Sequence, residues 1–433
     1  MVSVILLIRS CVLACVAMRN ETKTKAEVSD MRTGVDGFQG QRLSQLRMAQ
    51  NLTLAELGEK IERSSSTISA WEKGAQLPEA ESFDRLCHVF NVSRMWFLKP
   101  IPLAFQGEQR PHFFRSQASA HKQARERSRL YLAWLQEISD FFQDAMEWPE
   151  VNVPMLDADD CRLISDEEIE DIARECREAW SLGTAPIPNV IQVMENAGII
   201  CTRATLGHVK MDGVSHVSIL DGRPYVLIAE DKANAIRNRF DAAHELGHLV
   251  LHSKIPASQY AKNELYDLLE GQAHRFASAF LMPPESFAQE VVWPTLDNLL
   301  SLKSRWKVSV ASMIVRCRDL SLLTDQLELR LWKGRSARKW TKGEPGDDAF
   351  AFEQPKLMMR GAHLLIDNNI FERTELVYQI GLPSETIEML CNLRSGYLSA
   401  QPNAGDNVVP LKLRHNAARS GRAKRANVLP FQK

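Results

Sequence analysis

The sequence predicts a mainly α-helical protein of several domains, one of which is a small α+β domain. The chain has 433 residues, which is too long for one ordinary domain. Apolar residues recur at helical spacing over most of its length, whereas short segments between residues 199 and 229 are rich in β-branched residues and turn signals. Hydrophobic residues make up 45% of the chain and charged residues 25%, which is the balance of an ordinary globular protein.

The N-terminal residues are apolar but lack the features of a signal peptide. No basic segment precedes the apolar run, Arg9 interrupts it, and the run is too short to span a bilayer. We expect residues 1–36 to be a disordered extension, or the result of a start codon assigned too early, with Met31 as the true start. The eight cysteines include no CxxC pair, which favours reduced thiols in the cytoplasm. Because the net charge is −1, any contact with nucleic acid requires a local patch.

Residues 37–100 are expected to form a compact set of short helices. Thr53 is placed to cap one helix, Ser64 or Ser65 the next, and Gly74 closes that second helix. The segment LTLAELGEKIERSSSTISAWEKG resembles the XRE (Cro/repressor-like) helix-turn-helix pattern. The matching residues are Leu52, Thr53, Leu57, Ile61, Ser64, Thr67, Ile68, Ser69, Trp71, Glu72, Lys73 and Gly74. The resemblance implies an all-α DNA-binding domain.

In that fold the second helix of the motif lies in the major groove of double-stranded DNA, with its first turns at the base edges. Lys60 is a candidate for a phosphate contact. The resemblance implies an Arg47–Glu72 pair between the first and third helices inside the fold, and contact with DNA is the alternative for this pair. Two positions depart from the pattern: Leu54 stands where Gln is usual, and Glu62 where a turn Gly is usual. The alternative is a protein-interaction module that has lost tight DNA binding. The expected DNA contacts are Arg42, Ser64, Ser65, Ser66, Thr67, Ser69 and Lys73.

The rest of the chain divides by its element pattern. A long amphipathic helix is expected at about residues 118–147, ended by Trp148-Pro149. We expect a helical linker at residues 101–164, an α+β domain at 165–340, a C-terminal helical accessory region at 341–410 and a basic flexible tail at 411–433. Within the α+β domain, the dipeptides Asp212-Gly213 and Asp221-Gly222 predict the turns of a small antiparallel sheet.

The segment FDAAHELGHLVLH, residues 240–252, carries an HExxH pattern on an apolar helix. His244 and His248 are one turn apart, so both imidazoles project to the same side and can bind one zinc ion. Glu245 can take a proton from a water beside the metal, and Gly247 lets another element approach the helix. His252 continues the spacing, but eight residues of straight helix span about 12 Å. We therefore expect His252 in a supporting position or at the helix end, and not as a third ligand.

The third ligand is expected from a second helix, on which Glu264, Asp267 and Glu270 are the candidates. The segment LEGQAHRFASAFLMP, together with the HExxH segment, resembles the ImmA/IrrE family of zinc metallopeptidases, in which HExxH and ExxAxxFAxxxLMP supply two histidines and a glutamate. The resemblance covers about residues 165–290 and implies a zincin-like fold with one Zn²⁺ ion. The ligands and catalytic base that it implies are His244, His248, Glu270 and Glu245.

His274 stands where members of this family often have Asn. It lies one turn after Glu270 on the same side of the helix. It could orient Glu270, compete for the metal, or be an ordinary core or surface residue.

The two resemblances together imply a DNA-binding transcriptional regulator with a zinc endopeptidase domain. Such a domain cleaves a protein, often a helix-turn-helix repressor, by means of a metal-activated water. The expected partners are a double-stranded DNA operator and that protein substrate, with no membrane and with a homodimer as a further candidate assembly. One alternative is a non-catalytic regulator whose zincin-fold domain senses a ligand or partner. Another is an antitoxin-like or phage-derived protein that acts only by contacts.

Overall fold

The computed structural model describes residues 34–101, 122–208, 211–219, 221–232, 234–256, 259 and 263–399. The basic tail and nearly all of the expected N-terminal extension lie outside these residues. The described chain is mainly α-helical with one three-stranded sheet, which confirms the predicted fold class. In this part of the chain no helix is both long enough and apolar enough to cross a membrane.

The N-terminal module consists of short helices joined by capped turns. Thr53 and Glu56 form a reciprocal cap at the start of α3, and the Ser64 hydroxyl accepts a hydrogen bond from the backbone of α4. Glu62 ends α3 in the left-handed conformation, with φ 57°, and its carboxylate pairs with Arg85 at 2.6 Å. The helices of this module are α2 (Gly40–Ala49), α3 (Leu54–Ile61), α4 (Ser65–Glu72), α5 (Ala80–Phe90) and α6 (Arg94–Leu98).

The sheet has the strand order β1-β3-β2 and mixed strand directions. β3 (Pro224–Ala229) pairs parallel with β1 (Ile200–Ala204) and antiparallel with β2 (Gly213–Val217). The expectation of an antiparallel sheet is therefore wrong for β1, because β1 pairs with β3 and not with β2, the next strand in the sequence, and runs in the same direction as β3. The predicted turn at Asp221-Gly222 is present between β2 and β3, with Gly222 at φ +69°.

Alternate residues of the central strand enter two different hydrophobic cores. Tyr225 and Leu227 belong to one core, and Val226 and Ile228 belong to the other. Every residue of the three strands is buried, because helices cover both faces of the sheet.

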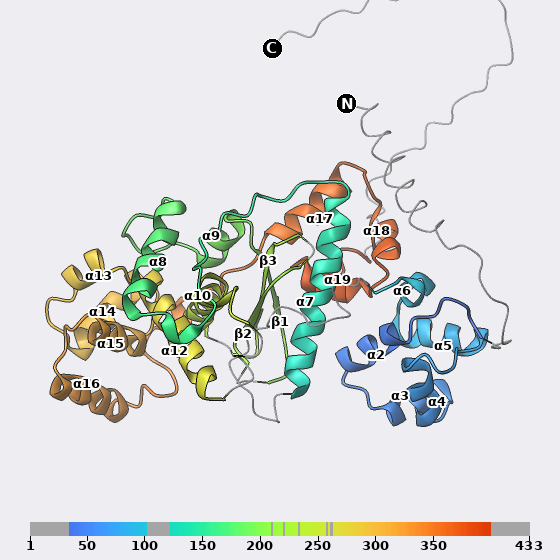
Figure 1. The fold of residues 1–433 in the computed structure, drawn as a ribbon, viewed down its shortest axis with the longest axis horizontal. Helices are drawn as coiled ribbons and strands as arrows, with labels where there is room; N and C mark the ends of the chain where they lie inside the picture. The colour runs from blue at the N-terminus through green and yellow to red at the C-terminus, as the bar shows by residue number, and fades with distance from the viewer. Residues whose placement is uncertain are drawn as a thin grey trace, which may run out of the picture. The chain divides into compact units, whose positions relative to one another are not determined.

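Helices from distant parts of the chain supply this cover (Figure 1). On one face lie α7 (Lys122–Gln143), α17 (Leu357–Asp367) and α19 (Ser384–Leu390), and on the other lies α10 (Ala235–His252), against which α12 (Asn263–Leu281) packs. The remaining helices are η3 (Cys161–Leu163), α8 (Asp166–Ala179), α9 (Val190–Asn196), α13 (Pro284–Glu290), α14 (Leu296–Trp306), α15 (Val310–Asp319), α16 (Asp325–Ala337), η4 (Asp347–Ala349) and α18 (Arg373–Ile380).

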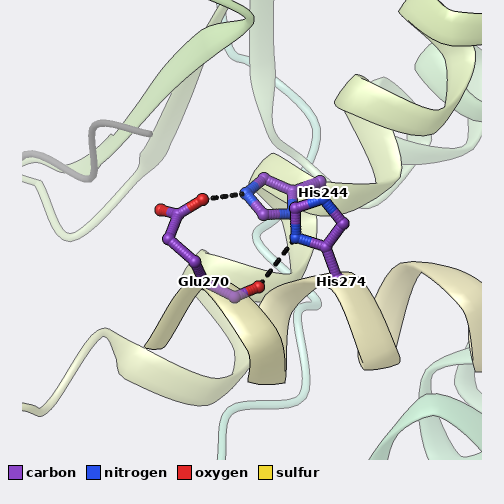
Figure 2. A group of neighbouring side chains, drawn as sticks. All are labelled: His244, Glu270 and His274. Atoms are coloured by element: carbon purple, nitrogen blue, oxygen red, sulfur yellow. Dashed lines mark hydrogen bonds and ion pairs between the residues drawn. The ribbon is translucent and has the colours of Figure 1, made fainter. Parts of the chain in front are cut away.

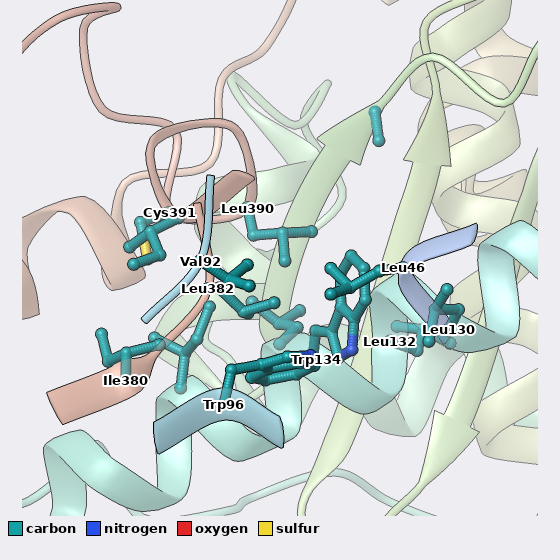
Figure 3. Close-up of a cluster of buried hydrophobic side chains, with 14 of the residues drawn as sticks. Leu46, Val92, Trp96, Leu130, Leu132, Trp134, Ile380, Leu382, Leu390 and Cys391 are labelled. Carbon is teal, nitrogen blue, oxygen red and sulfur yellow. The ribbon is translucent and has the colours of Figure 1, made fainter. Parts of the chain in front are cut away.

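The N-terminal module shares its hydrophobic core with α7 and the C-terminal helices. Figure 3 shows Leu46 and Trp96 of the module in one cluster with Trp134 of α7 and with Leu382 and Leu390. The rings of Trp96 and Trp134 meet edge-on, with centroids 5.7 Å apart. The module is therefore packed against α7 by large apolar side chains.

Candidate metal centre

Helix α10 presents the two histidines of the HExxH pattern on one face. The helix begins at Ala235 and is capped by Asn234, whose side chain accepts a hydrogen bond from the backbone N–H of Arg237. His244 and His248 are buried, and their Nε2 atoms lie 3.1 Å apart. Helix α12 brings Glu270 to the same point, with carboxylate oxygens 3.4 Å from Nε2 of His244 and 3.3 Å from Nε2 of His248. Two imidazole nitrogens and one carboxylate thus converge from two helices.

Gly247 permits the close crossing of α10 and α12. A Cβ atom at this position would lie 3.1 Å from the carbonyl oxygen of Ala273 and 3.1 Å from a ring atom of Phe276. Both neighbours follow Glu270 on α12, so the crossing that needs this glycine is the one that carries Glu270 to the histidines. The close approach expected at Gly247 is present.

Burial and hydrogen bonding set the charges of the donor atoms. Burial lowers the pKa of His244 to about 3, so the ring is neutral near pH 7 and can offer a nitrogen lone pair. Burial by itself would raise the pKa of Glu270, but hydrogen bonds with His244 and His248 outweigh it and hold that pKa well below its usual value. Imidazole nitrogen and ionised carboxylate are ligand types of zinc, so the donor set fits this ion.

Glu245 lies against strand β2. Its side chain is buried, and the hydroxyl of Ser215 donates a hydrogen bond to Oε2 at 2.8 Å. Gly213 does not form the turn that the sequence predicted; it is the first residue of β2 and pairs with Ile228. A Cβ atom at Gly213 would lie 2.9 Å from Cγ and Oε1 of Glu245, so glycine stands here because the strand passes the glutamate closely. No sequence signal marks Ser215 as the partner of Glu245.

His274 lies at the edge of this centre (Figure 2). Ligand atoms of His244, Glu270 and His274 all lie within 4.8 Å of one another. Nδ1 of His274 is 2.8 Å from the backbone oxygen of Glu270, so this nitrogen is the donor. The ring of His274 lies edge-on to that of His244, with centroids 4.4 Å apart. His274 is therefore close enough to contribute to the centre.

The other residues that the sequence analysis considered as ligands do not lie at the point where His244, His248 and Glu270 meet. Glu264 and Asp267 are solvent-exposed on α12, so the structure does not bring these acids to the histidine pair. His252 lies beside His248, with Nδ1 atoms 3.0 Å apart, and its Nε2 faces Gln272 at 3.1 Å. Gln272 carries no sequence signal, because a glutamine on an amphipathic helix is usually a solvent-exposed residue.

A cavity of about 350 Å³ borders the metal centre. His274 and Phe240 line it on the side of the centre, and their ring centroids are 5.8 Å apart. Trp332 and Trp340 belong to the same lining. Charged residues, among them Arg237 and Glu344, line the cavity together with these rings, so the space next to His274 is bordered largely by polar residues.

The helix-turn-helix residues are placed in two different environments. Ser65, Ser66 and Lys73 are exposed on or beside α4, whereas Thr67 and Ser69 are half-buried. Ser64 is exposed, but its hydroxyl accepts a hydrogen bond from the backbone N–H of Thr67 at 3.1 Å. The first turn of α4 is thus accessible to DNA.

Arg42 does not reach the surface. Its side chain is fully buried, and Nη1 and Nη2 lie 2.7 and 2.9 Å from the two carboxylate oxygens of Glu137 on α7. The expectation that Arg42 meets DNA is therefore corrected, because the face of α2 that carries it packs against α7. The pair expected between Arg47 and Glu72 is confirmed, with Nε 2.6 Å from Oε1.

Two family models match the chain. Residues 197–318 match the family described as IrrE N-terminal-like domain (Peptidase_M78), and residues 40–95 match a helix-turn-helix domain. The first match contains all three candidate ligands, and the second contains α2 to α5. The two matched segments are therefore similar to an IrrE N-terminal-like domain and to a helix-turn-helix domain, the two resemblances that the sequence predicted. No curated protein matches the chain.

Proposed function

We propose that this chain is a DNA-binding transcriptional regulator whose zinc-dependent endopeptidase domain cleaves a protein substrate of the helix-turn-helix repressor class. The proposal is carried by the convergence of His244, His248 and Glu270, whose donor atoms lie 3.1 to 3.4 Å apart. The Peptidase_M78 match over the same residues supports it.

The chain's own residues divide the work of peptide hydrolysis. His244, His248 and Glu270 hold one zinc ion, which when bound supplies a Lewis acid that acidifies water and polarises a carbonyl oxygen. Glu245 takes the proton from the attacking water and passes it to the leaving amine. Ser215 fixes one oxygen of the Glu245 carboxylate by its hydrogen bond, which orients the other.

The helix-turn-helix module places this activity on DNA. The exposed hydroxyls of Ser65 and Ser66 lie at the start of α4, the helix that enters the major groove in this motif. A repressor bound at the same operator would then be held close to the peptidase domain, which raises its effective concentration.

The test compares the wild-type chain with Glu245→Gln. Both proteins are analysed for bound zinc by mass spectrometry and are co-expressed with helix-turn-helix repressors encoded near the gene. We expect both to bind zinc and only the wild type to cleave a repressor. Glu264→Gln, which changes an exposed acid on α12, is the matched control and should cleave like the wild type. A wild-type chain that binds no zinc, or a Glu245→Gln chain that cleaves normally, overturns the proposal.

A further inference from the structure

The cavity of about 350 Å³ beside the metal centre has a volume in the range of sites that hold ligands. Its lining comes from helices α10, α12, α15 and α16 and from the segment 340–347. His274 lines the cavity and also lies edge-on to His244, with ring centroids 4.4 Å apart (Figure 2). A peptide held at the metal centre would therefore have a neighbouring side chain within reach of this space.

The carboxylate of Glu344, which lines the cavity, is fully used within the fold. Its Oε2 accepts a hydrogen bond from the backbone N–H of Val310 at 2.7 Å and lies 3.3 Å from Nζ of Lys303. Its Oε1 accepts from the backbone N–H of Ala311 at 3.1 Å and lies 3.2 Å from Nε of Arg335. Four donors surround the two oxygens, and two of these donors are cations, so Glu344 offers a bound group neither an acceptor nor an unbalanced charge.

The two other acids of the lining are also committed to the fold. Asp347 pairs with Lys303, and its Oδ2 accepts hydrogen bonds from the side-chain amide of Asn234 at 3.0 Å and from the backbone N–H of Glu344 at 2.8 Å. Asp241 is buried on α10 and has a partner within the chain. A basic ligand would therefore find no free carboxylate in this cavity.

Donor groups of the lining are not used up in the same way. Lys342 is exposed, and none of the described carboxylates lies within ion-pair distance of it. The guanidinium of Arg237 lies 3.5 Å from Asp212, but that carboxylate also pairs with Lys232, so two cations share one acid. Ser278 is 2% exposed, and its hydroxyl has no hydrogen-bond partner in the described chain. A buried hydroxyl of this kind is unfavourable unless a bound group accepts its hydrogen bond.

We propose that this cavity binds an acidic side chain of the protein substrate, glutamate or aspartate, close to the bond that is cleaved. Ser278 lies one turn after His274 on α12 and donates a hydrogen bond to the bound carboxylate. Lys342 and Arg237 supply the positive charge around it. That the ligand belongs to a substrate rests on the proposed function, whereas the preference of the cavity for a carboxylate does not.

Other kinds of side chain fit this lining less well. A basic side chain would face Lys342 and Arg237 without a free acid to pair with. An apolar side chain would leave the hydroxyl of Ser278 buried and unpaired, and sites built to form a hydrogen bond discriminate against ligands that lack it. The rings of Phe240 and Trp332 in the lining can pack against the methylene groups of a glutamate side chain.

The first test is the sequence preference of cleavage. The full zinc-loaded chain is incubated with a synthetic mixture of decapeptides of random sequence, and mass spectrometry identifies the cleaved bonds. We expect glutamate and aspartate to be enriched about 5-fold at one fixed position beside the cleaved bond, which is the size of effect that one accessible charge pair gives. Cleavage without this enrichment, or with aromatic or basic residues enriched at every position beside the bond, overturns the inference and leaves the proposed function intact.

A charge reversal identifies the cavity as the source of the preference. Lys342→Glu should abolish the enrichment of acidic residues, because the cation that faces them becomes an anion. Lys333→Glu is the matched control: it makes the same change in net charge at an exposed lysine of α16 that does not line the cavity, and its preference should equal that of the wild type. Equal preferences in Lys342→Glu and the wild type reject the assignment to this cavity.

Ser278→Ala separates a specific contact from general damage to α12. Its kcat/KM is measured on one acidic peptide from the mixture and on the same peptide with glycine in place of the acid. Loss of a hydrogen bond to a charged group should lower the ratio of the two values by about 10-fold. A structural role of the hydroxyl would lower both values equally and leave their ratio unchanged, which contradicts the proposed contact.

A binding experiment tests the cavity without any cleavage. Saturation-transfer NMR of the full chain compares N-acetylglutamate amide with N-acetyl-lysine amide as probes. We expect only the glutamate compound to bind, and its signal to be lost in Lys342→Glu but kept in Lys333→Glu. A chain that cleaves no peptide but shows this pattern contradicts the proposed function and marks the cavity as a site for a free carboxylate ligand. A chain that binds neither probe, or both equally, rejects the carboxylate preference.

Discussion

Arg42 and Glu137 form a two-point ion pair between the first helix of the helix-turn-helix module and α7, with side chains 0% and 5% exposed. The guanidinium of Arg42 also lies over the ring of Trp96, with its carbon 4.3 Å from the ring centroid. An arginine expected at the DNA surface is thus part of the contact between the module and α7. Helix α7 packs against both α2 of the module and strand β3 of the sheet, and α18 also contacts the module at α6.

Glu137→Ala should destabilise the protein strongly. Loss of one partner leaves the charge of Arg42 buried without compensation, which costs about 3–5 kcal/mol. Chemical denaturation of the full chain, followed by tryptophan fluorescence, measures the change. Glu126→Ala on the same helix is the matched control, because Glu126 pairs with Arg129 at the surface and such pairs contribute about 0–1 kcal/mol. Equal effects of the two variants would contradict the structural role of the buried pair.

Replacing either of two glycines on α10 and α12 by alanine should change the free energy of unfolding, in opposite directions for the two positions. A methyl group at Gly247 meets α12 at 3.1 Å, so Gly247→Ala should cost about 1–3 kcal/mol and shift Glu270 away from the histidines. At Gly271 nothing lies within 4 Å, so Gly271→Ala should stabilise α12 by about 0.5–1 kcal/mol. Thermal unfolding of the metal-free proteins measures both. A neutral Gly247→Ala variant would show that the helices do not cross as closely as described.

The sequence correctly predicted structural features that depend only on residues close to one another along the chain. The one-turn spacing of His244 and His248 was enough to place both rings on one face, and the spacing of Thr53 and Glu56 is that of the cap observed at α3. Such local patterns could not predict the buried environment of Arg42, because its partner, Glu137 on α7, is 95 positions away in the sequence.

The hydrogen bonds that support the residues of the candidate metal centre could not be predicted from the sequence for the same reason. Ser215 reaches Glu245 from a strand, and Gln272 reaches His252 from another helix. Serine and glutamine occur at many positions on strands and helices, so only the tertiary arrangement distinguishes these two. The direction of β1 was also not predicted. A strand that is buried on both faces is apolar along its whole length, whether its neighbour is parallel or antiparallel.

DNA binding should depend weakly on salt. The described module contains five arginines, and all of them pair with carboxylates: Arg42 with Glu137, Arg47 with Glu72, Arg63 with Glu79, Arg85 with Glu62 and Glu81, and Arg94 with Asp84. Lys60 and Lys73 remain as exposed basic residues that can meet phosphates. At about 0.9 ions released per phosphate contact, the slope of log K against log salt should be about −2 per module.

Fluorescence anisotropy of operator DNA over a range of salt concentrations measures this slope. Lys73→Ala should reduce its magnitude by about 1, since one phosphate contact is lost. Arg63→Ala, which removes a charge already paired with Glu79, should leave the slope unchanged. A slope several units steeper than −2 would mean that the ion pairs open on DNA.

The close contact between β2 and the catalytic-base candidate predicts a variant that separates metal binding from hydrolysis. A Cβ atom at Gly213 would lie 2.9 Å from Cγ and Oε1 of Glu245 and 3.0 Å from the carbonyl oxygen of Leu227, so the strand or the glutamate must move. The closest atoms around that Cβ include none from His244 or Glu270. Gly213→Ala should therefore keep its zinc, measured by mass spectrometry, and lose about 100-fold in the rate of substrate cleavage, because displacement of a base by about 1 Å has an effect of this size.

Ser215→Ala, which removes the hydrogen bond to Glu245 without adding bulk, is the paired variant and should lose less of the cleavage rate. Full activity in Gly213→Ala would show that Glu245 does not work from the position beside β2, whereas loss of zinc together with activity would mean that the strand also supports the ligands.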